Sequence, residues 1–120
     1  YFINDVLHNR PIQINSDGSA VRSYMYPTDF VDWLLHALLF SRDGDIFNIG
    51  SDEPITILEL AERINKTAGC SPNEINLRKK IVEFLRYIPD IGKISSEHRL
   101  NLAIDTNNAI KKTLNSMISQ

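Results

Sequence analysis

An arginine and two tyrosines stand at alternate positions, Arg22, Tyr24 and Tyr26, shortly after an Asp-Gly turn. Because alternate residues of a β-strand share one face, this spacing places a guanidinium beside two phenol rings. A guanidinium forms charge-assisted hydrogen bonds with phosphate, and two flat rings beside it suit a ring-containing ligand. The pattern indicates a site for a phosphorylated, ring-containing ligand, and the alternative is an ordinary strand that carries a solvated arginine.

Short extended segments are expected to position this arginine. Residues 11–15 alternate apolar and polar side chains, as a half-buried strand does. Residues 16–19 have turn chemistry, and residues 20–26 resume extended structure. We therefore expect a hairpin or a tight corner here, preceded by the end of a helix over residues 1–8.

A strongly apolar helix is predicted after the tyrosines. Thr28 or Asp29 is the expected N-cap, and residues 30–41 carry apolar side chains around most of the helix. This pattern predicts the most buried element of the chain. Residues 46–50 then have the pattern of a short strand that ends in glycine.

The second half of the chain contains three further predicted helices. Thr56 and Glu59 have the spacing of a capping box, so we expect an amphipathic helix from residue 57 to Gly69. Residues 91–100 and 106–118 also have helical periodicity, with a short extended piece between them.

The pattern that distinguishes helix from strand is weaker at residues 71–87, between the first of these helices and the last two. Residues 74–78 are compatible with a strand, and residues 79–86 with a loop or a helix. Short strands interleaved with helices, without an internal repeat, predict an α/β or α+β fold.

Composition limits the classes of function. The formal net charge is −2, which gives no global field for nucleic acid or an anionic membrane. No apolar run is long enough to span a bilayer. A single cysteine, Cys70, cannot form an internal disulfide, so the expected compartment is the reducing cytoplasm.

Few residues have the spacing of a catalytic or metal site. The three histidines are far apart, so no metal site is predicted. Asp32 and His36 are one helical turn apart, which more often gives a solvated contact than an acid-base pair. The basic cluster at residues 78–80 either contacts phosphate or is solvated surface. The five glycines form neither a dinucleotide-binding motif nor a P-loop.

Several segments, taken together and in order, resemble one enzyme family. Residues 11–18 and 21–29 resemble the strand, "GDG" turn and "RxYxYxxD" segment of the NAD-dependent epimerase/dehydratase family, the extended short-chain dehydrogenases that act on nucleotide sugars. The greatest similarity is to dTDP-glucose 4,6-dehydratase-like members. Residues 47–51 resemble the "YNIGS" strand, residues 56–64 the "tI.ELA..I" helix, and residues 86–93 the "RYvPDtsKa" segment.

The resemblance implies that residues 1–120 are the carboxy-terminal, nucleotide-sugar-binding portion of such an enzyme. A Rossmann domain that binds NAD(P) and a catalytic Tyr-x-x-x-Lys pair would lie upstream, since none of the four tyrosines here has a lysine four residues later. We read the start at Tyr1, inside a helix-like run, as a cut within a longer protein. The fragment alone is expected to bind substrate and not to catalyse.

The resemblance also implies roles for single residues. Arg22 would contact the diphosphate of a UDP- or dTDP-linked sugar, and Ile14 and Asn15 would lie along the nucleoside. Asn48 would face the same pocket, and Lys80 would be a second phosphate contact. The chain departs from the family pattern at Ser16, where the family has glycine, and again after Lys93, where Ser96-Glu97-His98 replaces "ELG".

The resemblance leaves several properties open. The full-length enzyme is expected to be an epimerase, dehydratase or decarboxylase, and it is a possible homodimer. The alternative function is a non-catalytic ligand-sensing or protein-interaction module that keeps the shape of this lobe.

Overall fold

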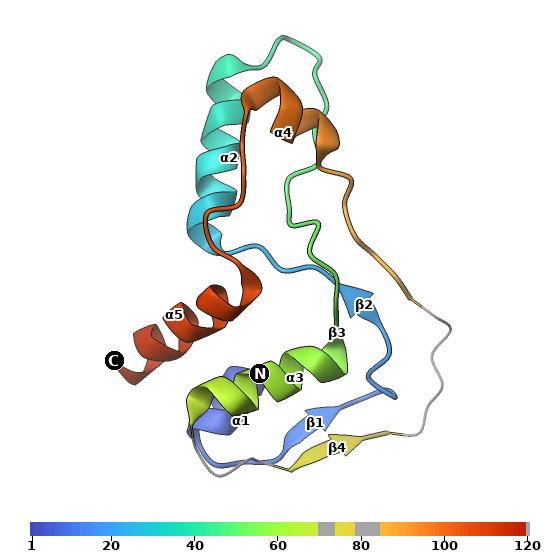
Figure 1. Ribbon diagram of the computed structural model, residues 1–120, viewed down its shortest axis with the longest axis vertical. Coiled ribbons are helices and arrows are strands. Elements are labelled where there is room, and N and C mark those ends of the chain that lie inside the picture. The colour runs from blue at the N-terminus through green and yellow to red at the C-terminus, as the bar shows by residue number, and fades with distance from the viewer. Residues whose placement is uncertain (70–73, 79–84, 120) are drawn as a thin grey trace.

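The computed structural model of the protein describes residues 1–69, 74–78 and 85–119 (Figure 1). The helices are α1 (Phe2–Leu7), α2 (Pro27–Phe40), α3 (Ile57–Ala68), α4 (Gly92–His98) and α5 (Thr106–Ile118). The strands are β1 (Ile12–Ile14), β2 (Val21–Arg22), β3 (Ile55–Thr56) and β4 (Ile75–Leu77). The described part of the chain is therefore a mixed α/β fold, as predicted.

Local sequence signals define the ends of α3 and α5. The Thr56 hydroxyl accepts from the Glu59 backbone N–H (3.0 Å), and the Glu59 carboxylate accepts from the Thr56 N–H (2.9 Å), which is the predicted capping box. Gly69 ends α3 in the left-handed conformation, with φ of 66°. At α5, the Asp105 carboxylate caps the helix by accepting from the Asn108 N–H (2.9 Å).

The start of α2 differs from the prediction. Tyr26 is the N-cap and Pro27 the first helical residue, whereas we expected Thr28 or Asp29 as the cap. The Asp29 side chain is buried instead, and it accepts hydrogen bonds from the backbone N–H groups of Ala103 (3.0 Å) and Ile104 (2.9 Å). This carboxylate joins α2 to the segment that leads into α5.

Residues 16–19 form a corner, not a hairpin. β1 pairs in parallel with β4, and β2 pairs antiparallel with β3, so β1 and β2 belong to different sheets. Gly18 has φ of 78°, and a Cβ there would lie 2.9 Å from the Cβ of Leu58, so the corner needs glycine. The Ser16 hydroxyl accepts from the Gly18 N–H (3.2 Å) and thereby stabilises the corner.

Two separate hydrophobic clusters hold the elements together. The first, here the Val6 cluster, contains the buried residues Val6, Ile12, Ile14, Ala61, Ile64, Ile110 and Leu114. The second, here the Trp33 cluster, contains Trp33, Ile91, Ile94 and Leu100. The Val6 cluster lies among α1, α3, α5 and β1, whereas the Trp33 cluster lies between α2 and α4 (Figure 1).

Two expectations for the middle of the chain are wrong. Helix α2 is not the most buried element, because Asp29 and Trp33 are its only buried residues. Residues 46–50 are not a strand, because no backbone hydrogen bond joins residues 47–49 to any described residue. Both differences have one physical cause, which is that neither segment has a partner on its outer side within the described chain.

Candidate functional site

Arg22 lies at the end of β2, where pairing with Ile55 of β3 fixes its backbone. Its side chain is half-buried, and Nη1 donates to the backbone oxygens of Val21 (2.8 Å) and Leu85 (3.0 Å). Nε and Nη2 make no hydrogen bond with the described residues. The guanidinium is thus anchored through one nitrogen and keeps donors free for an anion.

The segment around Leu85 holds Arg22 from its other side. The Val21 N–H donates to the Leu85 oxygen (2.9 Å), and the Tyr87 N–H donates to the Val21 oxygen (3.1 Å), so this segment runs parallel to β2. Strand β2, which ends at Arg22, therefore lies between β3 and the segment around Leu85. Such support restricts side-chain freedom before any ligand binds.

Tyr24 lies two residues beyond Arg22 and is 38% exposed. Partial burial raises the pKa of the Tyr24 phenol, and the charge on Arg22 opposes that rise. The phenol therefore stays protonated at neutral pH and is available as a hydrogen-bond donor. Tyr26 is half-buried at the start of α2.

An open hollow of about 540 Å³ lies beside the predicted nucleoside residues. Gln13, Ile14, Asn15 and Ser16 form one side of it. The other lining residues are Tyr1, Phe2, Asp5 and Ile57. Its size is within the ~300–1,000 Å³ range of small-molecule sites. The structure thus brings Ile14 and Asn15 to one concave surface.

A second, mainly apolar hollow adjoins the first, because Tyr1, Phe2 and Ile57 line both. Tyr24 lines the second hollow together with residues of α3 and α5. Arg22 is not among the lining residues of either hollow. The two hollows thus share Ile57, and the second includes Tyr24, which lies two residues beyond Arg22.

The structure does not add the two other predicted site residues to this surface. The Asn48 side chain donates to the backbone oxygen of Asp90 (3.0 Å), so in this structure it connects two loops. Lys80 lies outside the described residues. The roles of both residues in binding stay predictions.

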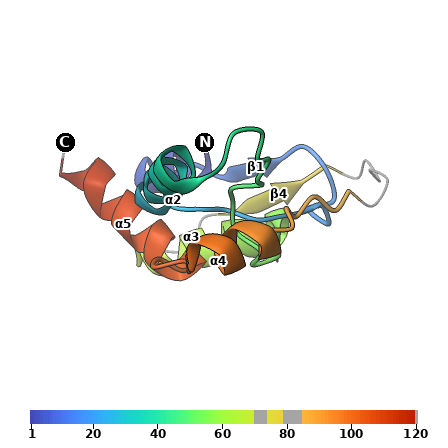
Figure 2. The same ribbon diagram turned by 90° about the horizontal axis from the view of Figure 1, so that it is seen from above.

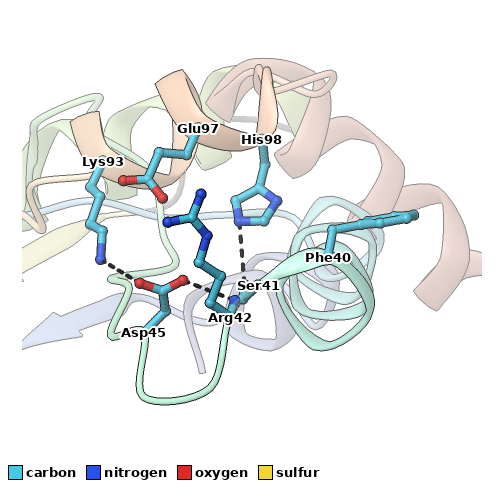
Figure 3. A pocket seen from close by; sticks show the side chains of 7 residues that line it. All are labelled: Phe40, Ser41, Arg42, Asp45, Lys93, Glu97 and His98. Carbon is cyan, nitrogen blue, oxygen red and sulfur yellow. Dashed lines mark hydrogen bonds and ion pairs between the residues drawn. The ribbon is translucent and has the colours of Figure 1, made fainter.

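A third hollow lies near the ends of α2 and α4 (Figure 3). Its lining residues are Phe40, Ser41, Arg42, Asp45, Lys93, Glu97 and His98. Lys93 pairs with the Asp45 carboxylate (3.3 Å), which also accepts from the Arg42 backbone N–H (2.9 Å). Ser41 Oγ lies 3.3 Å from His98 Nε2, and no carboxylate among the described residues hydrogen-bonds that imidazole. These contacts join the loop after α2 to helix α4 and do not form a nucleophile with an oriented base.

The remaining titratable groups of residues 1–69, 74–78 and 85–119 suggest no other site. His36 Nδ1 lies 3.5 Å from the Asp32 carboxylate on the surface of α2, a solvated contact of the expected kind. The described residues contain no group of histidine, cysteine and carboxylate side chains suited to a metal ion. No helix within the same residues is both long and apolar enough to cross a bilayer.

Sequence reasoning missed Gln13 as a lining residue of the first hollow. Gln13 and Asn15 are both exposed, while Ile12 and Ile14 between them are buried. The alternation of residues 11–15 contained this information, because residues two apart in a strand share a face. No sequence pattern indicated that Tyr1, Phe2 and Ile57 also line the hollow, since only the tertiary packing brings them to β1.

Comparison with known proteins relates the chain to one family. Residues 1–50 match the model of the NAD dependent epimerase/dehydratase family. The chain is 29% identical over 89 residues to the dTDP-D-glucose 4,6-dehydratase of Bos taurus. This similarity covers 74% of the chain and 24% of the relative.

Solved structures share the fold. The dTDP-glucose 4,6-dehydratase of Bacillus anthracis, in complex with NAD, gives a TM-score of 0.89 at 20% identity, over 99% of this chain and 38% of that one. The UDP-glucuronic acid 4-epimerase of Bacillus cereus, in complex with UDP-glucuronic acid and NAD, gives a TM-score of 0.84 at 22% identity. The match covers 98% of this chain and 38% of that one. The chain therefore spans from a quarter to two fifths of these proteins.

Proposed function

Because this chain belongs to the NAD-dependent epimerase/dehydratase family, we propose that it binds the nucleoside diphosphate part of a nucleotide sugar, as one part of a larger epimerase or dehydratase. Two relatives support this choice of ligand class, since one is named for a dTDP-sugar and another was solved with a UDP-sugar. The remainder of the enzyme would supply the catalytic residues.

One observation carries the proposal, namely an arginine that is anchored through Nη1 and keeps Nε and Nη2 free of the described residues. The nucleoside would lie in the hollow beside Ile14 and Asn15. The diphosphate would lie toward Arg22, which has Nε and Nη2 available. A planar guanidinium with two free donors on one edge matches two oxygens of a phosphate.

The chemical role of this chain would be positioning. An arginine held through its backbone neighbours loses little freedom when it binds a diphosphate. With the nucleotide fixed at one end, the sugar at the other end is held in a defined place for reaction. The protonated Tyr24 phenol, which lines the second hollow, would be an additional donor for the ligand.

NAD supplies hydride transfer in this family, and this chain does not have the residues that hold it in the usual way. Its glycines are residues 18, 44, 50, 69 and 92, so no glycine-rich turn opens any helix. No tyrosine has a lysine four residues later. The proposal therefore assigns cofactor binding and catalysis to residues outside this chain, and homodimerisation stays a prediction.

Calorimetric titration of UDP and dTDP tests the role of Arg22. Arg22→Ala should weaken binding about ten- to hundred-fold, because a hydrogen bond to a charged group contributes about 1.5–3 kcal/mol. Arg22→Lys should give an intermediate loss, since it keeps the charge and loses the planar fork.

Arg42→Ala is the matched control for this titration, since Arg42 is exposed and lines the separate hollow near α4. It should leave affinity unchanged. Equal affinities for the unsubstituted chain and Arg22→Ala would contradict the assignment. Absence of any nucleotide binding by the unsubstituted protein would favour the non-catalytic interaction module instead.

A further inference from the structure

The corner after β1 departs from the family pattern at Ser16. The family pattern has glycine at the start of its "GDG" turn, whereas this chain has Ser16-Asp17-Gly18. Glycine is favoured where the backbone takes a positive φ. Among the described residues other than glycine, positive φ occurs at Asn9 and Arg99 and not at Ser16. The left-handed residue of this corner is Gly18, so position 16 can carry a side chain without strain.

The backbone of the corner holds the Ser16 hydroxyl in place. The side chain is half-buried, and its oxygen accepts from the Gly18 N–H (3.2 Å). A hydroxyl has one O–H donor and two acceptor lone pairs. The bond from Gly18 uses one lone pair. The O–H donor of Ser16 therefore has no partner among the residues that the structure describes.

Ser16 lines the first hollow together with two amide side chains of β1. Gln13 and Asn15 are exposed, while Ile14 between them is buried in the Val6 cluster, so the two amides lie on the outer face of the strand. Figure 2 shows β4 beside β1, and pairing with β4 engages the backbone of β1 along that edge. The side chains of Gln13, Asn15 and Ser16 are thus the polar groups that β1 and its corner present to the hollow.

The charge in this hollow is already compensated. Asp5 is the one charged side chain among the lining residues, and its carboxylate pairs with Arg10 Nη2 (3.0 Å) and Nε (3.1 Å). The remaining polar groups are uncharged, and Phe2 and Ile57 add apolar surface. Neutral donors and acceptors beside apolar surface suit an uncharged ring with its own donors and acceptors, as in a pyrimidine nucleoside, and do not suit a phosphate.

We propose that Ser16 is a nucleoside-contacting residue of this chain, whose hydroxyl donates a hydrogen bond to an oxygen of the nucleoside. This inference rests on the proposed function and adds to it a contact that glycine at this position cannot make. Because the bond from Gly18 orients the hydroxyl before a ligand arrives, little side-chain freedom is lost when the nucleoside binds.

An NMR titration of the protein with uridine, and separately with UDP, tests this contact. Ser16→Ala should weaken the binding of both ligands by about three- to tenfold, as expected for the loss of one hydrogen bond between uncharged groups. Ser16→Gly, which restores the residue of the family pattern, should weaken binding to a similar extent. Ser16→Thr should retain most of the affinity, because it keeps the hydroxyl.

Asp17→Ala is the matched control, because Asp17 stabilises the same corner without lining the first hollow. Its carboxylate accepts from the backbone N–H (3.0 Å) and the hydroxyl (2.6 Å) of Ser19. Asp17→Ala should leave the affinity for uridine and UDP unchanged. Urea denaturation of the same variants measures the stability of the corner separately, so a loss of stability is not mistaken for a loss of a ligand contact.

Three results would overturn the inference. The first is an unchanged uridine affinity in Ser16→Ala. The second is an equal loss of affinity in Asp17→Ala, because the role of Ser16 would then be to stabilise the corner. The third is a loss for UDP alone, or saturable binding of UDP without saturable binding of uridine, because the contact would then be with the diphosphate.

The same titration separates this inference from the proposed function. If the unsubstituted protein binds neither UDP nor uridine, the proposed function fails and the role of Ser16 fails with it. If the unsubstituted protein and Ser16→Ala bind both ligands equally well, the proposed function stands and the inference about Ser16 alone is wrong.

Discussion

The two hydrophobic clusters of this chain differ in how completely the chain itself encloses them. The Val6 cluster is surrounded by α1, α3, α5 and β1, and it positions the hollow beside Ile14 and Asn15. The Trp33 cluster lies between α2 and α4, and the outer face of α2 remains exposed. The enclosed half carries the candidate binding surface, whereas the open half has an exposed apolar helix face.

The largest expected effect tests whether α2 has one structural face. Trp33→Ala should lower the free energy of unfolding by about 3–5 kcal/mol, because it leaves a large cavity in the Trp33 cluster. Leu38→Ala on the opposite face should change it by less than about 0.5 kcal/mol. Urea denaturation of both variants measures the difference. Similar losses would mean that the outer face is packed in solution.

The next effect tests the connection between the two halves. Asp29→Ala removes the acceptor of two backbone N–H groups at residues 103 and 104, and it should destabilise the chain by about 3 kcal/mol. Asp32→Ala is the control on the same helix, because Asp32 is exposed, and it should have almost no effect. Thermal unfolding followed by circular dichroism compares the two. Equal stabilities would show that this carboxylate is not needed to join the halves.

The smallest expected effect is the pH dependence of helix α3, which belongs to the enclosed half of the molecule. Hydrogen bonds from the Thr56 N–H and hydroxyl lower the pKa of Glu59. Because the folded-state pKa lies below the unfolded value of about 4.3, this stabilisation is complete above that value and is lost as the pH falls through the folded pKa. The helix content of α3 should therefore decrease in acid.

Glu59→Gln should remove that part of the acid dependence, and Thr56→Ala should cost about 1 kcal/mol at neutral pH. Glu62→Gln, an exposed change on the same helix, is the control. An acid transition that is identical in Glu59→Gln and the unsubstituted chain would contradict the role of the cap.

Most features that depend on signals within a few residues were predicted correctly from the sequence, with the N-cap of α2 as an exception. The capping box at Thr56 and Glu59, the stop at Gly69 and the span of α5 all depend on local hydrogen bonds and backbone preferences. Features that depend on distant partners were not. The apolar pattern of α2 predicted burial, but periodicity does not show whether another part of the described chain covers that face of the helix.

Dependence on distant partners also explains why the sequence could not decide between a hairpin and a corner, or predict the contacts of the site residues. A hairpin and a corner share the Asp-Gly turn, and only the pairing of β1 with β4 and of β2 with β3 distinguishes them. Arg22 was indicated by its spacing with Tyr24 and Tyr26 as well as by the family resemblance, and Ile14 and Asn15 by the resemblance alone. The roles of all three residues stay predictions. The contacts of Arg22 with Leu85 and of Asn48 with Asp90 join residues far apart in sequence, so no local pattern contains them.

The most direct test of the central claim is an NMR titration of the protein with UDP and with dTDP, which maps the bound nucleotide residue by residue. The account predicts saturable shifts at the amides of residues 13–16 and at the side chain of Arg22, with residues 41–45 near α4 unaffected. Shifts confined to the region near α4, or no saturable shifts for either nucleotide, would contradict it.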